Sequence, residues 1–159
     1  MTQRINYPEQ SPEHFKKLIA FSTSLNGGSI EEGIRHLVEI RASQLNGCGL
    51  CVDMHIKQAT IHGERALRLH HLAIWRESTL FAPRERAALA WTEVLTNLPE
   101  HGVPDDLFER VRTQLSEKEI SDLTFIVMSI NAWNRVSVAF KTPPGALDAA
   151  YGLDKANLQ

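Results

Sequence analysis

Apolar residues recur every three to four positions along nearly the whole chain, and no stretch alternates with period two for the length of a strand. The clearest case begins with Ile34, Leu37 and Val38, which further apolar residues follow at the same spacing. This spacing places the apolar side chains on one face of an α-helix. We therefore predict an all-α fold, a compact bundle of about six to seven helices. Their predicted ranges are 12–25, 29–45, 48–61, 64–75, 83–95, 105–115 and 116–140.

Local signals mark where these helices begin and end. Ser29 to Glu32 and Ser116 to Glu119 have the spacing of a capping box, in which the hydroxyl and the carboxylate satisfy each other's backbone amides. Asn46-Gly47 predicts a helix end, because both residues tolerate a left-handed backbone. A new helix is therefore expected to start immediately after Gly47.

The segment 116–140 is apolar on several faces, which predicts burial in the core or in a subunit contact. Thr142-Pro143-Pro144-Gly145 then ends the helical pattern. A chain of 159 residues can bury a core of its own, so we predict one domain over 1–159. Its core is expected at about 10–142, with 143–159 as a polar C-terminal tail.

The composition limits which kinds of partner and which cellular compartment we expect for the protein. The net charge is -2, and no basic run marks a surface for nucleic acid or for anionic lipid. The N-terminus lacks the apolar core of a signal peptide, and no run approaches the roughly 20 apolar residues of a membrane span. We expect a soluble, cytoplasmic protein without a nucleic-acid or membrane partner. In that compartment, a close cysteine pair is more often catalytic or metal-binding than structural.

The chain has two cysteines, Cys48 and Cys51, and they open the segment that follows the Asn46-Gly47 break. Helical residues three and four positions apart share a face, so Cys48, Cys51 and His55 are expected to form one column. A helix N-terminus or a neighbouring imidazole lowers a thiol pKa from about 8.5 to roughly 3.5–7.5. The spacing therefore predicts a redox-active dithiol, in which one sulfur attacks and the other resolves.

Two other interpretations of the cysteine pair compete with redox chemistry. The cysteines could be buried, unreactive residues, or they could form half of a zinc site with His55 and another histidine. No second Cys-x-x-Cys motif supports zinc, and Val52 stands where a haem-attachment motif requires histidine.

The run from Ile40 to His55, with Ser-Gln-Leu-Asn-Gly before the Cys-x-x-Cys-x3-His core, resembles the alkyl hydroperoxidase D-like branch of the carboxymuconolactone decarboxylase superfamily. The resemblance covers roughly residues 10–142. It implies an all-helical fold, assembly as a homo-oligomer such as a trimer or hexamer, and a thiol peroxidase activity. It further implies that Cys51 attacks the peroxide, Cys48 resolves the intermediate as a disulfide, and His55 is the base.

From the residues alone, either cysteine could provide the attacking sulfur. The helix N-terminus favours a thiolate at Cys48, whereas the imidazole of His55 favours Cys51. We expect the imidazole to outweigh the helix dipole, which contributes roughly 0.3–1 kcal/mol at an exposed helix end. This expectation agrees with the role that the resemblance implies for Cys51.

Two positions depart from the family pattern. Some members have a histidine directly before the second cysteine, and this chain has Leu50 there. Where that pattern has the glutamate of a proton relay, twelve residues before the first cysteine, this chain has His36. Either His36 takes this role, or a carboxylate such as Glu93 or Glu39 reaches the site. Alternatively, His36 is a solvated residue on the polar face of its helix. We interpret Asp53, on the opposite helix face from His55, as structural or solvated.

The predicted function is an oxidoreductase: an antioxidant peroxidase that reduces organic hydroperoxides or hydrogen peroxide. It needs no bound cofactor but an external dithiol, such as a lipoyl or thioredoxin-like electron donor. Alternatives are a general disulfide oxidoreductase and a non-enzymatic zinc or redox-sensing module. Lactone decarboxylation is disfavoured, because decarboxylases of the superfamily lack the dithiol that Cys48 and Cys51 provide.

Overall fold

The computed structural model describes residues 2–158, and every regular element in this range is helical, which confirms the all-α prediction. The described residues form more helices than the predicted six to seven, because several short helices were not predicted. In chain order the elements are α1 (Tyr7–Gln10), α2 (Pro12–Ser24), α3 (Glu32–Leu45), α4 (Gly49–Ile61), α5 (Ala66–His71), the 3-10 helix η1 (Leu72–Glu77), α6 (Pro83–Thr96), α7 (Asp105–Arg112), α8 (Glu117–Phe140), α9 (Asp148–Tyr151) and the 3-10 helix η2 (Leu153–Ala156).

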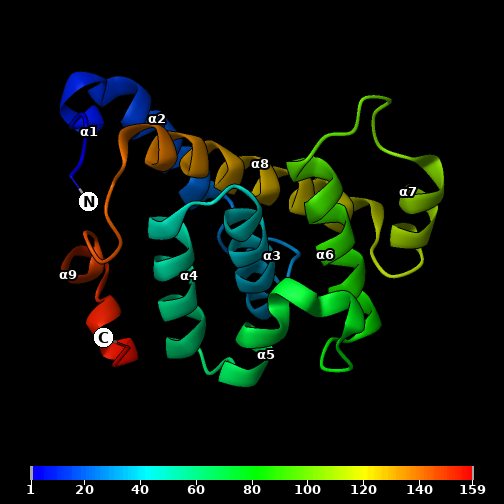
Figure 1. Ribbon diagram of the computed structural model, residues 1–159. Coiled ribbons are helices and arrows are strands. Elements are labelled where there is room, and N and C mark those ends of the chain that lie inside the picture. The colour runs from blue at the N-terminus through cyan, green and yellow to red at the C-terminus, as the bar shows by residue number, and fades with distance from the viewer. Residues whose placement is uncertain (1, 159) are drawn as a thin grey trace.

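Helix α3 lies at the centre of the molecule. It packs against α4, α6 and α8, and α8 runs across the ends of these helices with α2 alongside it (Figure 1). The apolar face expected for α3 divides between two clusters. Val38 packs with α6, α7 and α8, whereas Leu37 and Ile40 pack with α4, α5 and α6. Helix α3 is therefore covered on several sides, which decides where its polar residues lie.

The two predicted capping boxes have different outcomes. Ser116 and Glu119 form the box at the start of α8, with the Ser116 N–H donating to Glu119 Oε2 over 2.7 Å. The predicted box at Ser29 is wrong, because α3 begins only at Glu32 and has no side-chain cap. The Ser29 hydroxyl instead donates to Asp122 of α8 over 2.6 Å. A partner distant in sequence has replaced the local one.

The predicted helix over 64–75 is divided into α5 and η1. Within η1 the backbone is also kinked at Ile74, which is non-helical (φ −118°, ψ 28°). The Arg86 guanidinium donates to the carbonyls of Trp75 and Ser78 at the end of η1. This contact from α6 stabilises the irregular end of the segment.

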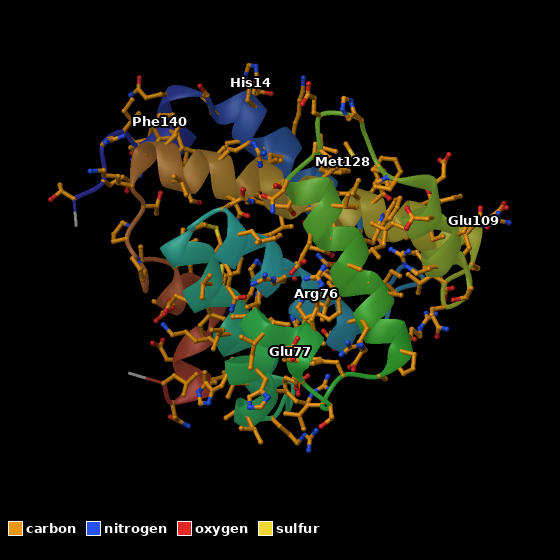
Figure 2. The ribbon with its side chains drawn as sticks, turned by 45° about the vertical axis from the view of Figure 1, so that its right-hand side comes forward. His14, Arg76, Glu77, Glu109, Met128 and Phe140 are labelled. Carbon is orange, nitrogen blue, oxygen red and sulfur yellow. A yellow bond between two sulfur atoms is a disulfide. The ribbon has the colours of Figure 1, made fainter. Side chains whose placement is uncertain are left out.

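The expectation that α8 is buried all round holds for only part of its surface. Phe125, Met128 and Val138 are exposed, and Met128 lies on the outer side of α8 (Figure 2). By length and composition α8 could cross a membrane, which the sequence analysis did not expect, but within this fold it packs against α2, α3, α4, α6 and α7. The homo-oligomer that would cover an exposed apolar face stays a prediction.

The C-terminal segment is not the polar tail that we expected. Its two short helices, α9 and η2, lie along α4 (Figure 1), and Leu153 and Ala156 are buried. Lys57 of α4 is the polar anchor, since its Nζ donates to Asp148 over 2.6 Å and to Asp53 over 2.9 Å. Asp53 therefore has the structural role that we interpreted for it.

Candidate active site

Cys48 and Cys51 lie at the N-terminus of α4, as the sequence predicted. Gly47 makes the turn out of α3 with a left-handed backbone (φ +65°), and Cys48 is the N-cap residue of α4. The two sulfurs form a disulfide, with the Cα atoms 5.3 Å apart. The Cys51 N–H points to Cys48 Sγ at 3.3 Å. Both residues are buried, at 1% and 3% exposure. The structure thus holds the oxidised form of a dithiol whose first sulfur accepts a helix N-terminal amide.

His55 follows Cys51 by one turn on α4 and is buried between α4 and α3. Its Nδ1 lies 3.3 Å from Oε2 of Glu39, a buried residue of α3. The separation is that of an ion pair, although it does not meet the geometry of a hydrogen bond. A carboxylate next to Nδ1 favours a proton on that nitrogen, which leaves Nε2 as the basic nitrogen of the ring.

Arg35 fixes the other oxygen of this carboxylate. Its Nε donates to Glu39 Oε1 over 3.0 Å, and its guanidinium also donates to the side chain of Asn26 over 2.6 Å. Glu39 is thus shared between a cation on its own helix and the imidazole of His55. Of the carboxylates named from the sequence, Glu39 is the one that reaches the cysteine helix.

The alternative that His36 is a solvated residue is wrong. The side chain is buried at 6% exposure, because α4 covers this side of α3. Its Nε2 lies 2.8 Å from His62 Nδ1, and the two rings are stacked. Burial lowers the pKa of the His36 imidazole below its usual value near 6.5, an effect that the nearby Glu39 carboxylate offsets only in part. His36 therefore contacts the end of α4 at His62, and its side chain makes no hydrogen bond to His55 within residues 2–158.

Glu93, the other carboxylate considered from the sequence, is engaged elsewhere. It accepts hydrogen bonds from Arg41 (2.7 Å), from the Trp75 indole (2.8 Å) and from Arg76. Burial alone raises the pKa of the Glu93 carboxyl, but these donors outweigh burial and hold the pKa below its ordinary value. Glu93 joins α3, η1 and α6 and does not contact His55.

A buried amide network lies behind the cysteines, and the sequence did not predict it. The Asn46 side chain donates to Oδ1 of Asn131 (3.0 Å) and of Asn134 (2.8 Å), both on α8. Asn134 in turn donates to the Ser43 hydroxyl over 3.0 Å, and this hydroxyl donates to the Glu39 carbonyl over 2.7 Å. The network fixes the turn between α3 and α4. Asparagines at helical spacing in the apolar segment 116–140 were the available signal.

Access to the disulfide is restricted by the C-terminal segment. Leu147 packs against the cluster that contains both cysteines, and a Cβ added at Gly49 would lie 3.4 Å from Pro144. Two surface hollows of about 600 and 850 Å³ lie elsewhere, near Trp75 and near Tyr7, and neither is lined by the cysteines. The C-terminal segment therefore covers part of the cluster around the disulfide.

Residues 12–94 match the sequence profile of the carboxymuconolactone decarboxylase family. The uncharacterized protein YdfG of Bacillus subtilis (strain 168) is 40% identical over 139 residues, which span 87% of this chain and 95% of YdfG.

Solved structures share most of this fold. ATU0492 of Agrobacterium tumefaciens, a protein of unknown function with a provisional assignment as the antioxidant defence protein AhpD, superposes with a TM-score of 0.87 at 38% identity, covering 91% of this chain and 99% of that one. An uncharacterized peroxidase-related protein of Ralstonia eutropha JMP134, which has an alkylhydroperoxidase AhpD core, gives a TM-score of 0.77 at 22% identity, covering 87% and 74%. This second likeness concerns the fold alone. The resemblance stated from the sequence is thus confirmed, and the chain belongs to the carboxymuconolactone decarboxylase family, with the AhpD-like helical fold.

Proposed function

We propose that the protein is a thiol-dependent peroxidase that reduces organic hydroperoxides or hydrogen peroxide. The observation that carries this proposal is the Cys48–Cys51 disulfide at the start of α4, one turn from an imidazole whose Nδ1 faces a buried carboxylate. A dithiol in this setting has the means to form a thiolate, to be oxidised and to close a disulfide. Membership of a family with AhpD-like and peroxidase-related structures supports an antioxidant role.

The proposed cycle begins at Cys51. In the reduced protein, His55 takes the thiol proton, and the thiolate attacks the peroxide. An S–O bond forms, the O–O bond breaks, and the leaving alkoxide takes a proton to become an alcohol. Cys51 is then a sulfenic acid, oxidised by two electrons. The Cys48 thiol attacks this sulfur, so that the S–S bond forms and water leaves.

An external dithiol completes the cycle by thiol–disulfide exchange, returning two electrons and two protons. A lipoyl group or a thioredoxin-like protein supplies this chemistry, and no bound cofactor takes part. We assign to Glu39 the role that the sequence analysis divided among His36, Glu93 and Glu39. Glu39 orients the ring of His55, because it is the carboxylate at ion-pair distance from Nδ1.

The test is consumption of hydrogen peroxide and of an organic hydroperoxide with dithiothreitol as the donor. The wild type is expected to turn over, whereas Cys51→Ser and His55→Ala lose most of the rate. Trapping with a dimedone-type reagent assigns the attacking sulfur. We expect a label on Cys51 in the Cys48→Ser variant and none in Cys51→Ser. A label that persists only in Cys51→Ser would assign the attack to Cys48.

A general disulfide oxidoreductase is the second candidate, because the same disulfide could exchange with a protein substrate and never meet a peroxide. Parallel assays with an organic hydroperoxide and with a disulfide substrate such as oxidised glutathione separate the two. Turnover of the disulfide without consumption of either peroxide would favour this second function.

A further inference from the structure

A second group of ligand-type side chains lies at the opposite end of the α3–α4 pair from the disulfide. It consists of Glu32 and His36 on α3 and His62 at the end of α4. Since α3 and α4 run antiparallel, the start of α3 meets the end of α4, and the cysteines lie at their other ends (Figure 1). We infer that Glu32, His36 and His62 form a binding site for a divalent transition-metal ion, with Zn²⁺ as the reference ligand.

The backbone brings the three ligand atoms together. Glu32 and His36 are four residues apart on one helix and therefore share a face. His62 caps the C-terminus of α4, immediately before the turn at Gly63. Its Nδ1 lies 2.8 Å from His36 Nε2 and 3.7 Å from Glu32 Oε1, and all three ligand atoms lie within 4.8 Å of one another.

The chemistry of the set suits Zn²⁺, which binds neutral imidazoles and carboxylates in tetrahedral sites, with a solvent molecule completing three protein ligands. Zn–N bonds of about 2.0–2.1 Å at tetrahedral angles separate two ligand nitrogens by about 3.3 Å. The two histidine nitrogens must therefore move apart from 2.8 Å by about half an ångström. The side chains of His62 and Glu32 are exposed and free to make this adjustment, whereas the buried His36 is the fixed ligand.

The surroundings also favour a cation. The partial negative charge at the end of α4 and the Glu32 carboxylate offset the partial positive charge at the start of α3. The cluster of Glu32, His36 and His62 is distinct from the cysteine-based zinc site that we considered from the sequence.

The experiment is a titration of the oxidised, full-length protein with Zn²⁺, in which isothermal titration calorimetry measures the binding. The disulfide keeps both sulfurs from binding metal, so the signal reports the histidine site. We expect one ion per chain, and about tenfold or greater loss of affinity in His62→Ala and Glu32→Gln. Both residues are exposed, so their replacement leaves the fold intact, which circular dichroism checks. His70→Ala, which changes another exposed histidine, is the matched control and is expected to bind as the wild type does.

Co²⁺ provides a second readout, because its visible spectrum distinguishes nitrogen and oxygen ligands from thiolate. We expect bands of a low-symmetry site without thiolate charge transfer, and these bands are lost in His62→Ala. Absence of saturable binding, equal affinity in wild type and His62→Ala, or binding that requires reduced cysteines would each overturn the assignment.

Discussion

Glu39 Oε2 lies 3.3 Å from His55 Nδ1 and thereby joins α3 to α4 next to the disulfide. The family pattern has its relay glutamate at the position of His36, three residues earlier on the same helix. Residues three apart share a helix face, so a carboxylate one turn further along α3 still faces α4. The altered position does not leave the site without a carboxylate, because Glu39 provides one.

Replacing Glu39 by glutamine is expected to lower kcat/KM for peroxide by about 10–100-fold, since the imidazole of His55 then loses the anion that orients it. The rate of alkylation of the reduced cysteines by iodoacetamide at pH 7 is expected to fall as well. The alkylation rate reports how much thiolate forms. Loss of packing alone does not lower this rate, so a lower rate points to reduced thiolate formation. Glu77→Gln, at an exposed position on η1 (Figure 2), is the control. Unchanged alkylation in Glu39→Gln would remove this residue from the mechanism.

His36 predicts a dependence of stability on pH. Because the folded-state pKa of His36 is lowered, the unfolded chain binds a proton more tightly than the folded one. The contribution of His36 to the free energy of unfolding is complete above pH 6.5 and is lost as the pH falls towards the folded-state pKa. The total loss is about 1.4 kcal/mol for each unit by which that pKa is lowered. The groups acting on the ring are the carboxylates of Glu39 and Glu32 and the imidazoles of His62 and His55.

The measurement is the free energy of unfolding in urea at pH 7.5 and at pH 5.5. His36→Asn is expected to lose less stability between these values than the wild type loses. The exposed His14 (Figure 2) provides the matched variant His14→Asn, which is expected to retain the wild-type difference. Equal differences in all three proteins would show that the proton uptake on unfolding does not arise at His36.

The sequence predicted the placement of Cys48, Cys51 and His55 on α4 because that arrangement is local. The turn at Gly47, the start of the helix and the spacing of Cys48, Cys51 and His55 all lie within nine residues. The carboxylate partner could not be chosen in the same way. Sequence periodicity gives a helix one buried face, but α3 is packed on by α4, α6 and α8. Polar residues such as Glu39 therefore become buried on sides that the periodicity assigns to solvent.

Long-range partners account for the other differences. Ser29 has the spacing of a local cap but binds Asp122, 93 residues away in the sequence. The C-terminal segment is polar in composition, yet Lys57 and Asp148, 91 residues apart, hold it against α4. Neither pairing leaves a periodic signal, because each depends on how separate helices are placed by the core. Helix boundaries thus follow from neighbouring residues, whereas side-chain partners follow from the packing.

Asn134 is expected to be the most sensitive residue of the amide network. The side chain is completely buried, accepts from Asn46 and donates to Ser43. Asn134→Ala leaves a cavity and an amide of Asn46 with one partner fewer, so we expect a loss of about 2–4 kcal/mol in the free energy of unfolding. Asn97→Ala, at the exposed end of α6, is expected to cost far less. Equal losses in urea denaturation would mean that the network does not stabilise this turn.

Lys57 is expected to control access to the disulfide. Its Nζ bridges Asp53 and Asp148, and Lys57→Met removes both charge-assisted hydrogen bonds and leaves two carboxylates facing each other. We expect the free energy of unfolding to fall by about 1–3 kcal/mol. If the segment that carries Leu147 opens locally, each 1.4 kcal/mol lost from the closed state raises the open population about tenfold.

Reduction of the disulfide by dithiothreitol, measured under native conditions, is therefore expected to accelerate in Lys57→Met. The control is Lys155→Met, which alters an exposed lysine of η2 and is expected to leave the reduction rate unchanged. An unaltered reduction rate in a destabilised Lys57→Met protein would mean that the C-terminal segment does not limit access to the sulfurs.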